Sequence, residues 1–103
     1  ESEKYDRLHI VFGVVKDKDL QAILPLLPKN ADYYFTKPSI ERALDEKTLA
    51  QEAGKYQLWG TTFDSVSEAV RAAREKATEN DFIFIGGSSF VVADALPLFV
   101  NPL

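Results

Sequence analysis

The sequence contains no cysteine, no methionine and a single histidine, His9. Without cysteine the chain can form no disulfide, no thiolate nucleophile and no cysteine–zinc site, a pattern that suits the reducing cytoplasm. One histidine also argues against a histidine-based metal site or a local catalytic triad, so we expect neither catalytic residues nor metal ligands in this chain. The missing methionine indicates a chain that is processed or belongs to a longer polypeptide.

Charge and hydrophobic runs exclude further classes of partner. The 12 basic residues are outnumbered by 16 acidic ones, for a net charge of −4, and there is no basic block to attract nucleic acid or anionic lipid. No apolar run approaches the roughly 20 residues that a membrane span needs. A length of 103 residues with 46% hydrophobic content suits one domain with a real core. We therefore expect one domain over residues 1–103, with no nucleic-acid or membrane partner.

Apolar segments alternate with amphipathic ones along the chain. Strands are expected at residues 8–15, 31–36, 57–60 and 82–85, and helices at 20–27, 46–53, 66–77 and 89–96. Strands that are apolar on both faces and alternate with helices predict an α/β fold, a three-layer Rossmann-like domain whose parallel sheet carries helices on both faces. The first and fourth strands are the most apolar, so we expect both to be central or nearly so. If they are neighbours, the order is fourth–first–second–third, which is the order we predict.

Local signals support these boundaries. Asp45 and Ser65 are predicted N-caps, and Gly54 is a predicted helix stop. The aromatic residues of the second and third strands are expected in the sheet core, and the histidine is expected to be a satisfied core or edge residue; these positions are Tyr33, Tyr34, Phe35, Trp59 and His9.

The carboxyl end of the sheet is the expected binding site. Open parallel sheets bind ligands where neighbouring connections leave toward opposite faces, which here is between the first and fourth strands. Two turns would face each other there, Lys-Asp-Lys-Asp at 16–19 and Gly-Gly-Ser-Ser at 86–89. Helix amino ends, close backbone approach at glycine, serine hydroxyls and the charge of Lys16 or Lys18 would suit a carboxylate or phosphate.

Both turns also have a plain structural interpretation. Residues 86–89 can be a tight turn with an N-cap, and residues 16–19 can be a solvated loop in which Asp19 caps a helix. Neither segment matches a phosphate-binding loop or a dinucleotide-binding glycine pattern. The residues alone leave both interpretations open.

Four segments, taken in order, resemble a known family. Residues 9–19 are similar to a strand followed by Gly-x-x-x-Asp-Lys-Asp, and residues 36–44 to a Pro…Arg-Ala-Leu segment. Residues 64–69 resemble Asp-Ser-Val-x-Glu-Ala, and residues 84–94 resemble Gly-Ser followed by five residues and an acid. The ordered set covers nearly the whole chain and resembles the C-terminal domain of bacterial folylpolyglutamate synthase/dihydrofolate synthase, a relative of the Mur ligases.

The resemblance implies an ATP-dependent ligase that joins L-glutamate to dihydropteroate or folate through an acyl phosphate. In such an enzyme ATP and Mg²⁺ are held mainly by a larger N-terminal ATPase domain of the same polypeptide. The C-terminal domain closes over the nucleotide and helps to place glutamate. Lys18 would then bind a glutamate carboxylate, and Ser88 or Ser89 would donate a hydroxyl hydrogen bond. The residues expected to shape the site are Lys16, Asp17, Asp19, Arg42, Gly86 and Gly87.

One departure from the family is visible. The family's domain begins with a strand that ends in Asp-x-Ala-His-Asn-Pro, a motif that this sequence lacks. We therefore expect a domain truncated at its N-terminal side, without the family's first two strands, and no catalysis by the isolated chain. Residues 82–85 would then lie at a sheet edge, where two copies could associate. The alternative is a stand-alone Rossmann-like or flavodoxin-like module that binds a small anion or nucleotide.

Overall fold

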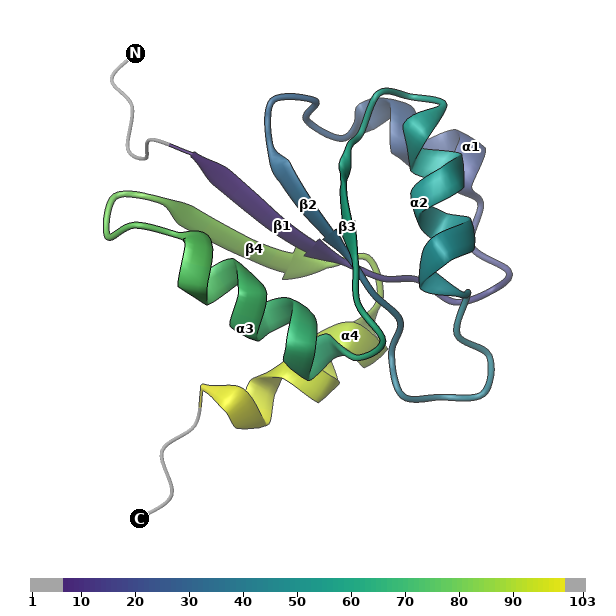
Figure 1. Ribbon diagram of the computed structural model, residues 1–103. Helices are drawn as coiled ribbons and strands as arrows, with labels where there is room; N and C mark the ends of the chain where they lie inside the picture. The colour runs from purple at the N-terminus through teal and green to yellow at the C-terminus, as the bar shows by residue number, and fades with distance from the viewer. Residues whose placement is uncertain (1–6, 100–103) are drawn as a thin grey trace.

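The computed structural model describes residues 7–99, in which a sheet lies between two pairs of helices (Figure 1). The elements in chain order are β1 (Leu8–Phe12), α1 (Leu20–Ile23), the 3₁₀ turn η1 (Leu24–Leu26), β2 (Asp32–Phe35), α2 (Glu46–Gly54), β3 (Gly60–Thr62), α3 (Val66–Lys76), β4 (Phe82–Gly86), α4 (Ser89–Ala95) and the 3₁₀ turn η2 (Leu96–Leu98). Strands and helices alternate as the sequence predicts.

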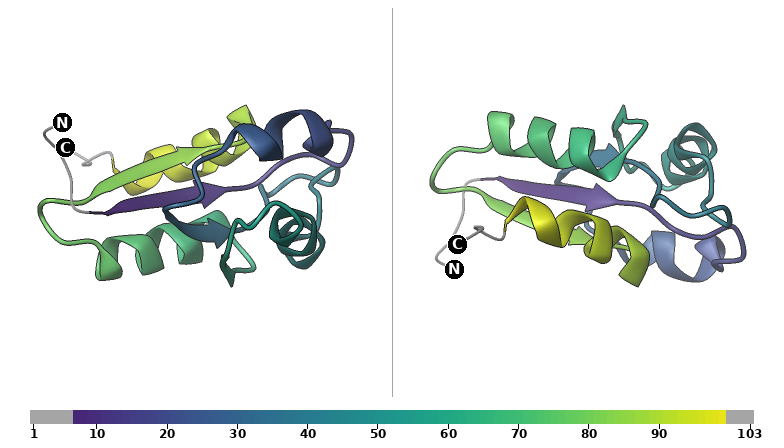
Figure 2. Two further views of the ribbon diagram at one scale, coloured as in Figure 1. Left: turned by 90° about the horizontal axis from the view of Figure 1, so that it is seen from above. Right: turned by 90° about the horizontal axis from the view of Figure 1, so that it is seen from below.

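Within residues 7–99 the sheet has four strands in the order β3-β2-β1-β4. Every neighbouring pair is parallel, with His9 of β1 opposite Asp32 of β2 and Ile83 of β4. Figure 2 shows β1 between β4 and β2. Counted from the other edge, this is the predicted order, fourth–first–second–third, so the predicted fold is confirmed.

Each face of the sheet has its own core. Alternate residues of a strand point to opposite faces, so β1 and β2 contribute to both cores. The face covered by α1 and α2 buries Ile10, Phe12, Tyr33, Phe35, Leu24 and Leu49. The face covered by α3 and α4 buries Val11, Tyr34, Val66, Val70, Val91 and Ala95. The helices thus cover both faces, and the three aromatic residues predicted in the second strand, Tyr33, Tyr34 and Phe35, are core residues as predicted.

Side-chain caps open all four α-helices of the described chain. Asp19 accepts a hydrogen bond from the Ala22 amide at 3.3 Å, and Asp45 accepts from the Lys47 and Thr48 amides, each at 3.0 Å. The Ser65 hydroxyl accepts from the Glu68 amide at 3.2 Å and the Ser88 hydroxyl from the Phe90 amide at 3.1 Å. Such caps satisfy amides that have no partner inside the helix. The predicted N-caps at 45 and 65 are confirmed. So are the capping role considered for Asp19 and the N-cap considered within residues 86–89, which is Ser88.

β1 ends earlier than predicted, at Phe12 instead of Val15. The Gly13 amide still donates to the carbonyl of Gly86 at 3.3 Å. Beyond it the chain leaves the sheet, and Val15 forms an isolated antiparallel bridge with Ala43. The apolar run hid this boundary, because its last residues remain buried or half-buried while their backbone pairs with a loop.

β3 lies further along the chain than the predicted strand at 57–60. Gln57 takes a left-handed conformation (φ 65°) and turns the chain after α2, a role predicted for Gly54, which instead is the last helical residue. Leu58 is buried and its amide donates to the Ala53 carbonyl at 3.1 Å. Trp59 is 64% exposed, so its predicted place in the sheet core is wrong. Its ring lies against Gly54.

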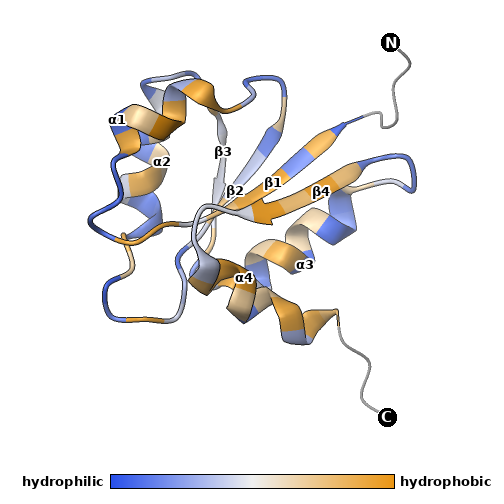
Figure 3. Cartoon of the chain, turned by 180° about the vertical axis from the view of Figure 1, so that it is seen from behind, coloured by the Kyte–Doolittle hydropathy of each residue, from blue (hydrophilic) through white to orange (hydrophobic). Residues whose placement is uncertain are grey.

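β4 forms one edge of the sheet within residues 7–99, as predicted. It is hydrophobic along its length (Figure 3), and Ile83 and Ile85 pack against the core under α3 and α4. On the opposite face Phe84 is 50% exposed, because neither α1 nor α2 extends over this strand. Edge-to-edge association of two copies remains a prediction.

Candidate functional site

The carboxyl ends of β1 and β4 meet in a glycine contact. Gly87 has φ 99°, and a Cβ placed there would lie 2.4 Å from the Gly13 carbonyl oxygen and 2.9 Å from the Phe12 ring. Only glycine fits this conformation and this spacing. From here α1 follows β1 onto one face and α4 follows β4 onto the other. The predicted change of direction between the first and fourth strands is therefore present.

The loop between β2 and α2, residues 36–45, joins the two predicted turns. The Lys16 amide donates to the Arg42 carbonyl at 2.8 Å, which fixes the loop to the turn after β1. The Arg42 guanidinium carbon lies 5.9 Å from the ring centre of Phe90, in the first turn of α4. Arg42 therefore reaches the start of α4 from a loop that is also bonded to the 16–19 turn. This loop and the two turns together form the candidate site, to which we refer as the crevice.

The charged residues of the 16–19 turn are all exposed. The Lys18 amide donates to the Val15 carbonyl at 3.2 Å and closes the turn, while the Asp19 side chain caps α1. No hydrogen bond or ion pair within residues 7–99 joins Lys18 to Ser88 or Ser89. The structure thus brings Lys16 and Arg42 together through backbone contacts and leaves the lysine side chains in solvent.

Ser88 and Ser89 differ in environment. Ser88 is half-buried and caps α4, whereas Ser89 is exposed at the first position of the helix. α4 has seven residues and α1 has four, so few aligned peptide dipoles act at either helix start. The predicted attraction of an anion by the helix ends is therefore small, and side chains must supply most of it.

A buried carboxylate lies near the other end of the 36–45 loop. Glu46 opens α2 with its side chain 4% exposed, and its Oε1 lies 3.6 Å from the Lys37 ammonium nitrogen. That oxygen accepts no hydrogen bond from the described residues. Hydrogen bonds from the Thr48 and Lys47 amides hold the pKa of the neighbouring Asp45 below its usual range. The ion pair between Lys37 and Glu46 ties the two ends of the loop together.

Sequence reasoning missed several residues of this site. Ser39 and Phe90 had no assigned role, and Glu46 was expected only as part of a helix. Asp94 was noted as the acid of a motif but was not a candidate site residue. Asp94 accepts a hydrogen bond from Ser39, which lies 55 residues away in the sequence. Because that partner is so distant, the spacing of the motif was the one sequence signal that pointed to Asp94.

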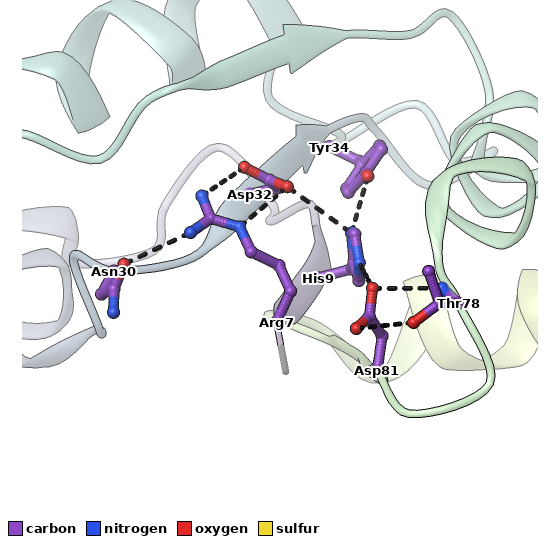
Figure 4. A network of polar contacts seen from close by, with 7 residues as sticks. All are labelled: Arg7, His9, Asn30, Asp32, Tyr34, Thr78 and Asp81. Atoms are coloured by element: carbon purple, nitrogen blue, oxygen red, sulfur yellow. Dashed lines mark hydrogen bonds and ion pairs between the residues drawn. The ribbon is translucent and has the colours of Figure 1, made fainter. Parts of the chain in front are cut away.

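The opposite, amino end of the sheet holds a polar network around His9 (Figure 4). His9 is buried, with Nδ1 2.8 Å from the Tyr34 hydroxyl and Nε2 2.8 Å from Asp81 Oδ2. Asp81 also accepts hydrogen bonds from the amide and hydroxyl of Thr78, each at 3.1 Å. Both ring nitrogens therefore have partners, which confirms the predicted satisfied histidine.

An ion pair between the residue before β1 and the first residue of β2 extends this network. The Arg7 guanidinium donates twice to Asp32, at 2.6 and 3.1 Å. Asp32 Oδ2 also lies 3.8 Å from His9 Nδ1. The hydrogen bond from Arg7 lowers the pKa of Asp32, and the hydrogen bond from His9 lowers that of Asp81. Burial raises the pKa of Tyr34 to about 12. All these groups are engaged with one another, so the network is structural.

A surface hollow between α3 and η2 is a weaker candidate site. Its lining residues are Ser67, Val70, Arg71, Arg74, Glu75 and Leu98. Arg74 is already engaged, since it donates to the Leu98 carbonyl at 3.4 Å and lies 4.9 Å from the Phe99 ring centre. The hollow lies outside the crevice, and none of the predicted site residues lines it.

Two findings concern metal ions and membranes. Across residues 7–99 no group of three or more histidines or acids is placed to hold a metal ion. In the same part of the chain no helix is both long and apolar enough to cross a bilayer.

The sheet order and the two helical layers define a Rossmann-like α/β domain. The chain belongs to the family of Mur ligase glutamate ligase domains, whose family model matches residues 1–89. This establishes the resemblance seen in the ordered motifs.

The chain is similar to several folate enzymes. It is 37% identical to a probable bifunctional folylpolyglutamate synthase/dihydropteroate synthase of Halobacterium salinarum. That alignment of 94 residues covers 88% of this chain and 11% of the Halobacterium protein. It is 26% identical over 108 residues to the dihydrofolate synthase/folylpolyglutamate synthase of Buchnera aphidicola, with 94% of this chain and 24% of that protein covered.

A solved structure agrees in fold and in sequence. The structure of E. coli FolC in complex with DHPP and ADP matches with a TM-score of 0.81 and 29% identity, over 93% of this chain and 22% of that one. The Mycobacterium tuberculosis folylpolyglutamate synthase complexed with ADP matches in fold, with a TM-score of 0.76, 22% identity, and coverage of 97% of this chain and 25% of that one. These relatives do not favour the alternative of a stand-alone flavodoxin-like module.

Proposed function

We propose that the chain is the glutamate-placing C-terminal domain of a cytoplasmic, ATP-dependent ligase that adds L-glutamate to dihydropteroate or folate. The observation that carries this proposal is the crevice itself, in which the 36–45 loop brings Arg42 to the Ser88–Ser89 turn and to the lysine turn after β1. Cations and hydroxyl donors are the groups that recognise carboxylates. Family membership makes glutamate the carboxylate to expect.

In the proposed reaction the folate-side carboxylate is first phosphorylated by ATP. The glutamate amine then attacks the acyl carbon, an amide bond forms and inorganic phosphate leaves. The role of this chain is to hold glutamate so that its amine faces the acyl phosphate. Lys18 would bind a glutamate carboxylate through a charge-assisted hydrogen bond. Lys16 and Arg42 add positive charge to the same crevice.

Ser88 can serve both as a cap and as a ligand contact. Its oxygen accepts a hydrogen bond from the Phe90 amide at 3.1 Å. A hydroxyl has one donor and two acceptor positions, so its proton remains available to an oxygen of the substrate. Ser89, exposed beside it, is the other candidate donor. Gly86, Gly87, Asp17 and Asp19 shape the turns without a direct role.

ATP and Mg²⁺ belong to another part of the proposed enzyme. The described residues form no cluster of three or more acids or histidines that fits a metal ion. We therefore assign nucleotide and metal to an N-terminal ATPase domain of the same polypeptide, and we expect the isolated chain to have no ligase activity.

The test uses the complete protein that contains this chain, assayed for glutamate-dependent phosphate release with ATP, Mg²⁺ and dihydropteroate or tetrahydrofolate. Lys18→Ala should raise the KM for glutamate about ten- to a hundredfold, the usual effect of losing a hydrogen bond to a charged group. The KM for ATP should stay the same. Lys29→Ala is the matched control, because Lys29 is exposed in the loop before β2, at the other end of the sheet. An impaired ATP dependence with unchanged glutamate dependence would overturn the assignment.

A further inference from the structure

The 36–45 loop is held to α4 by a two-bond contact. The Ser39 amide donates to Asp94 Oδ2 at 2.7 Å, and the Ser39 hydroxyl donates to Asp94 Oδ1 at 3.0 Å. Both oxygens of one half-buried carboxylate are thereby used by a single residue of the loop. Hydrogen bonds to an ionised acceptor are stronger than neutral ones, so this contact fixes the loop relative to the helix.

The same face of α4 carries a second contact with the loop. Phe90 and Asp94 are four residues apart, which places them on one face of a helix. Ser39 is hydrogen-bonded to Asp94. Arg42 follows Ser39 by three residues in the loop, and its guanidinium lies over the ring of Phe90. A cation over an exposed ring is held only weakly. Within residues 7–99 the Arg42 side chain has no carboxylate partner, so its position depends on how the loop is anchored.

We propose that Asp94 is a positioning residue of the crevice. By binding Ser39 it fixes the 36–45 loop to α4, whereas the bond between the Lys16 amide and the Arg42 carbonyl fixes the loop to the turn after β1. The bond to Ser39 thereby holds the Arg42 guanidinium beside the Ser88–Ser89 turn, where it faces a carboxylate of the substrate. The contact with Ser39 also keeps the Asp94 carboxylate engaged, so that it does not pair with Arg42 and neutralise it. The identity of the substrate rests on the proposed function, whereas the anchoring of Arg42 does not.

The first arm of the test measures the position of Arg42 without any substrate. In the 103-residue chain, the Arg42 side-chain protons should show upfield NMR shifts caused by the Phe90 ring. Asp94→Ala should reduce these shifts, and Asp94→Asn, which retains one acceptor for Ser39, should reduce them less. Glu75→Ala, which removes an exposed acid from α3, is the control and should leave them unchanged.

The second arm measures glutamate use by the complete protein. Asp94→Ala should raise the KM for glutamate about two- to tenfold, the range expected for loss of ordinary hydrogen bonds, with the KM for ATP unchanged. In the Arg42→Ala background the same change should have no further effect, because residues that act through one another are not additive. A purely structural role would instead lower stability and leave the ratio of the two KM values unchanged.

The outcomes separate this proposal from the proposed function. If Lys18→Ala weakens glutamate use while Asp94→Ala changes neither the Arg42 shifts nor the KM for glutamate, the positioning role is wrong and the glutamate site stands. If the shifts respond but neither Lys18→Ala nor Arg42→Ala affects glutamate, the anchoring is right and the glutamate assignment is wrong. Should Asp94→Ala not fold, the double variant Asp94→Asn with Ser39→Ala removes the carboxylate charge and the hydroxyl bond and leaves only the amide bond. Unchanged shifts in that variant would overturn the proposal.

Discussion

The amino end of the sheet and its carboxyl end use polar side chains in opposite ways. Around His9 the central groups, His9, Tyr34 and Asp81, are buried or half-buried, and the bonds join β1, β2 and the turn before β4. In the crevice the cations are exposed, and the contacts that fix the loops are mostly made by backbone groups. A group that already has its partners stabilises the fold, whereas an exposed group on an anchored loop is available to a ligand.

This contrast separates the expected effects of substitution. Changes in the His9 network should lower stability, because they leave buried donors or acceptors unsatisfied. Changes of the crevice cations should affect substrate use and little else, as is usual for exposed residues. The glycine contact between the two turns is the exception. At that contact the stability of the fold depends on backbone geometry, so a substitution there should lower stability even though it lies at the carboxyl end of the sheet.

The largest effect on stability is expected from Gly87→Ala. Its left-handed conformation strains any other residue by about 1–3 kcal/mol, and the new Cβ would also lie 2.4 Å from the Gly13 carbonyl oxygen. Because that neighbour is backbone, the strands themselves must separate. We expect the free energy of unfolding, measured with urea, to fall by about 3 kcal/mol or more.

Gly54→Ala is the matched control for this prediction. Gly54 ends α2, and a Cβ there would lie 3.0 Å from the ring of Trp59, an exposed side chain that can move. Alanine is the better helix former, by up to about 1 kcal/mol. The stability of this variant should stay within about 1 kcal/mol of the original. Equal losses in the two variants would show that the left-handed contact has no special role.

A smaller loss is expected from His9→Leu. The substitution keeps the bulk of the side chain but removes the partner of the Tyr34 hydroxyl and of Asp81. Removing one partner of a buried hydrogen bond costs about 1–3 kcal/mol, and urea unfolding should show a loss in that range. Tyr34→Phe, which removes one hydroxyl and one bond, should cost less. A His9→Leu variant of unchanged stability would contradict the structural role of the network.

The pH dependence of stability provides a second test of the same network. The hydrogen bond from His9, with those from Thr78, holds the pKa of Asp81 below its usual range. A lowered pKa means that the ionised carboxylate stabilises the fold above the unfolded pKa of about 4, and that this contribution is lost as the pH falls through the folded pKa. In His9→Leu the stability should therefore depend less steeply on pH below about 4.

Much of this architecture was predictable from local sequence patterns. The two most apolar segments are the adjacent strands β1 and β4, and Asp45 and Ser65 begin helices as their spacing predicts. These features depend on neighbours in the sequence, because caps and strand hydrophobicity are local.

The errors have physical causes of two kinds. Hydrophobicity could not show where β1 ends, since Val14 is buried outside the strand, and it placed the exposed Trp59 in the core. The contacts that organise the crevice join residues far apart in the sequence. Ser39 and Asp94 are 55 positions apart, and each is unremarkable in its own segment. Only the fold reveals such a pair.

The smallest effect, and the finest test of the contrast, concerns the two serines of the crevice. Ser88→Ala removes the cap of α4 and should lower the free energy of unfolding by about 1 kcal/mol. Ser89→Ala changes an exposed residue without a capping contact and should change it by less than about 0.5 kcal/mol. Thermal or urea unfolding of the chain measures both.

Ser88→Asp then separates capping from substrate binding. Aspartate caps helices as well as serine does, so the fold should retain its stability. Its carboxylate, however, cannot donate a hydrogen bond, and it repels an anionic substrate. In the complete protein we therefore expect Ser88→Asp to raise the KM for glutamate more than Ser88→Ala does, although it is the more stable of the two. If Ser88→Asp and Ser89→Ala both use glutamate normally, neither hydroxyl contacts the substrate, and the turn at 86–89 serves only to begin α4.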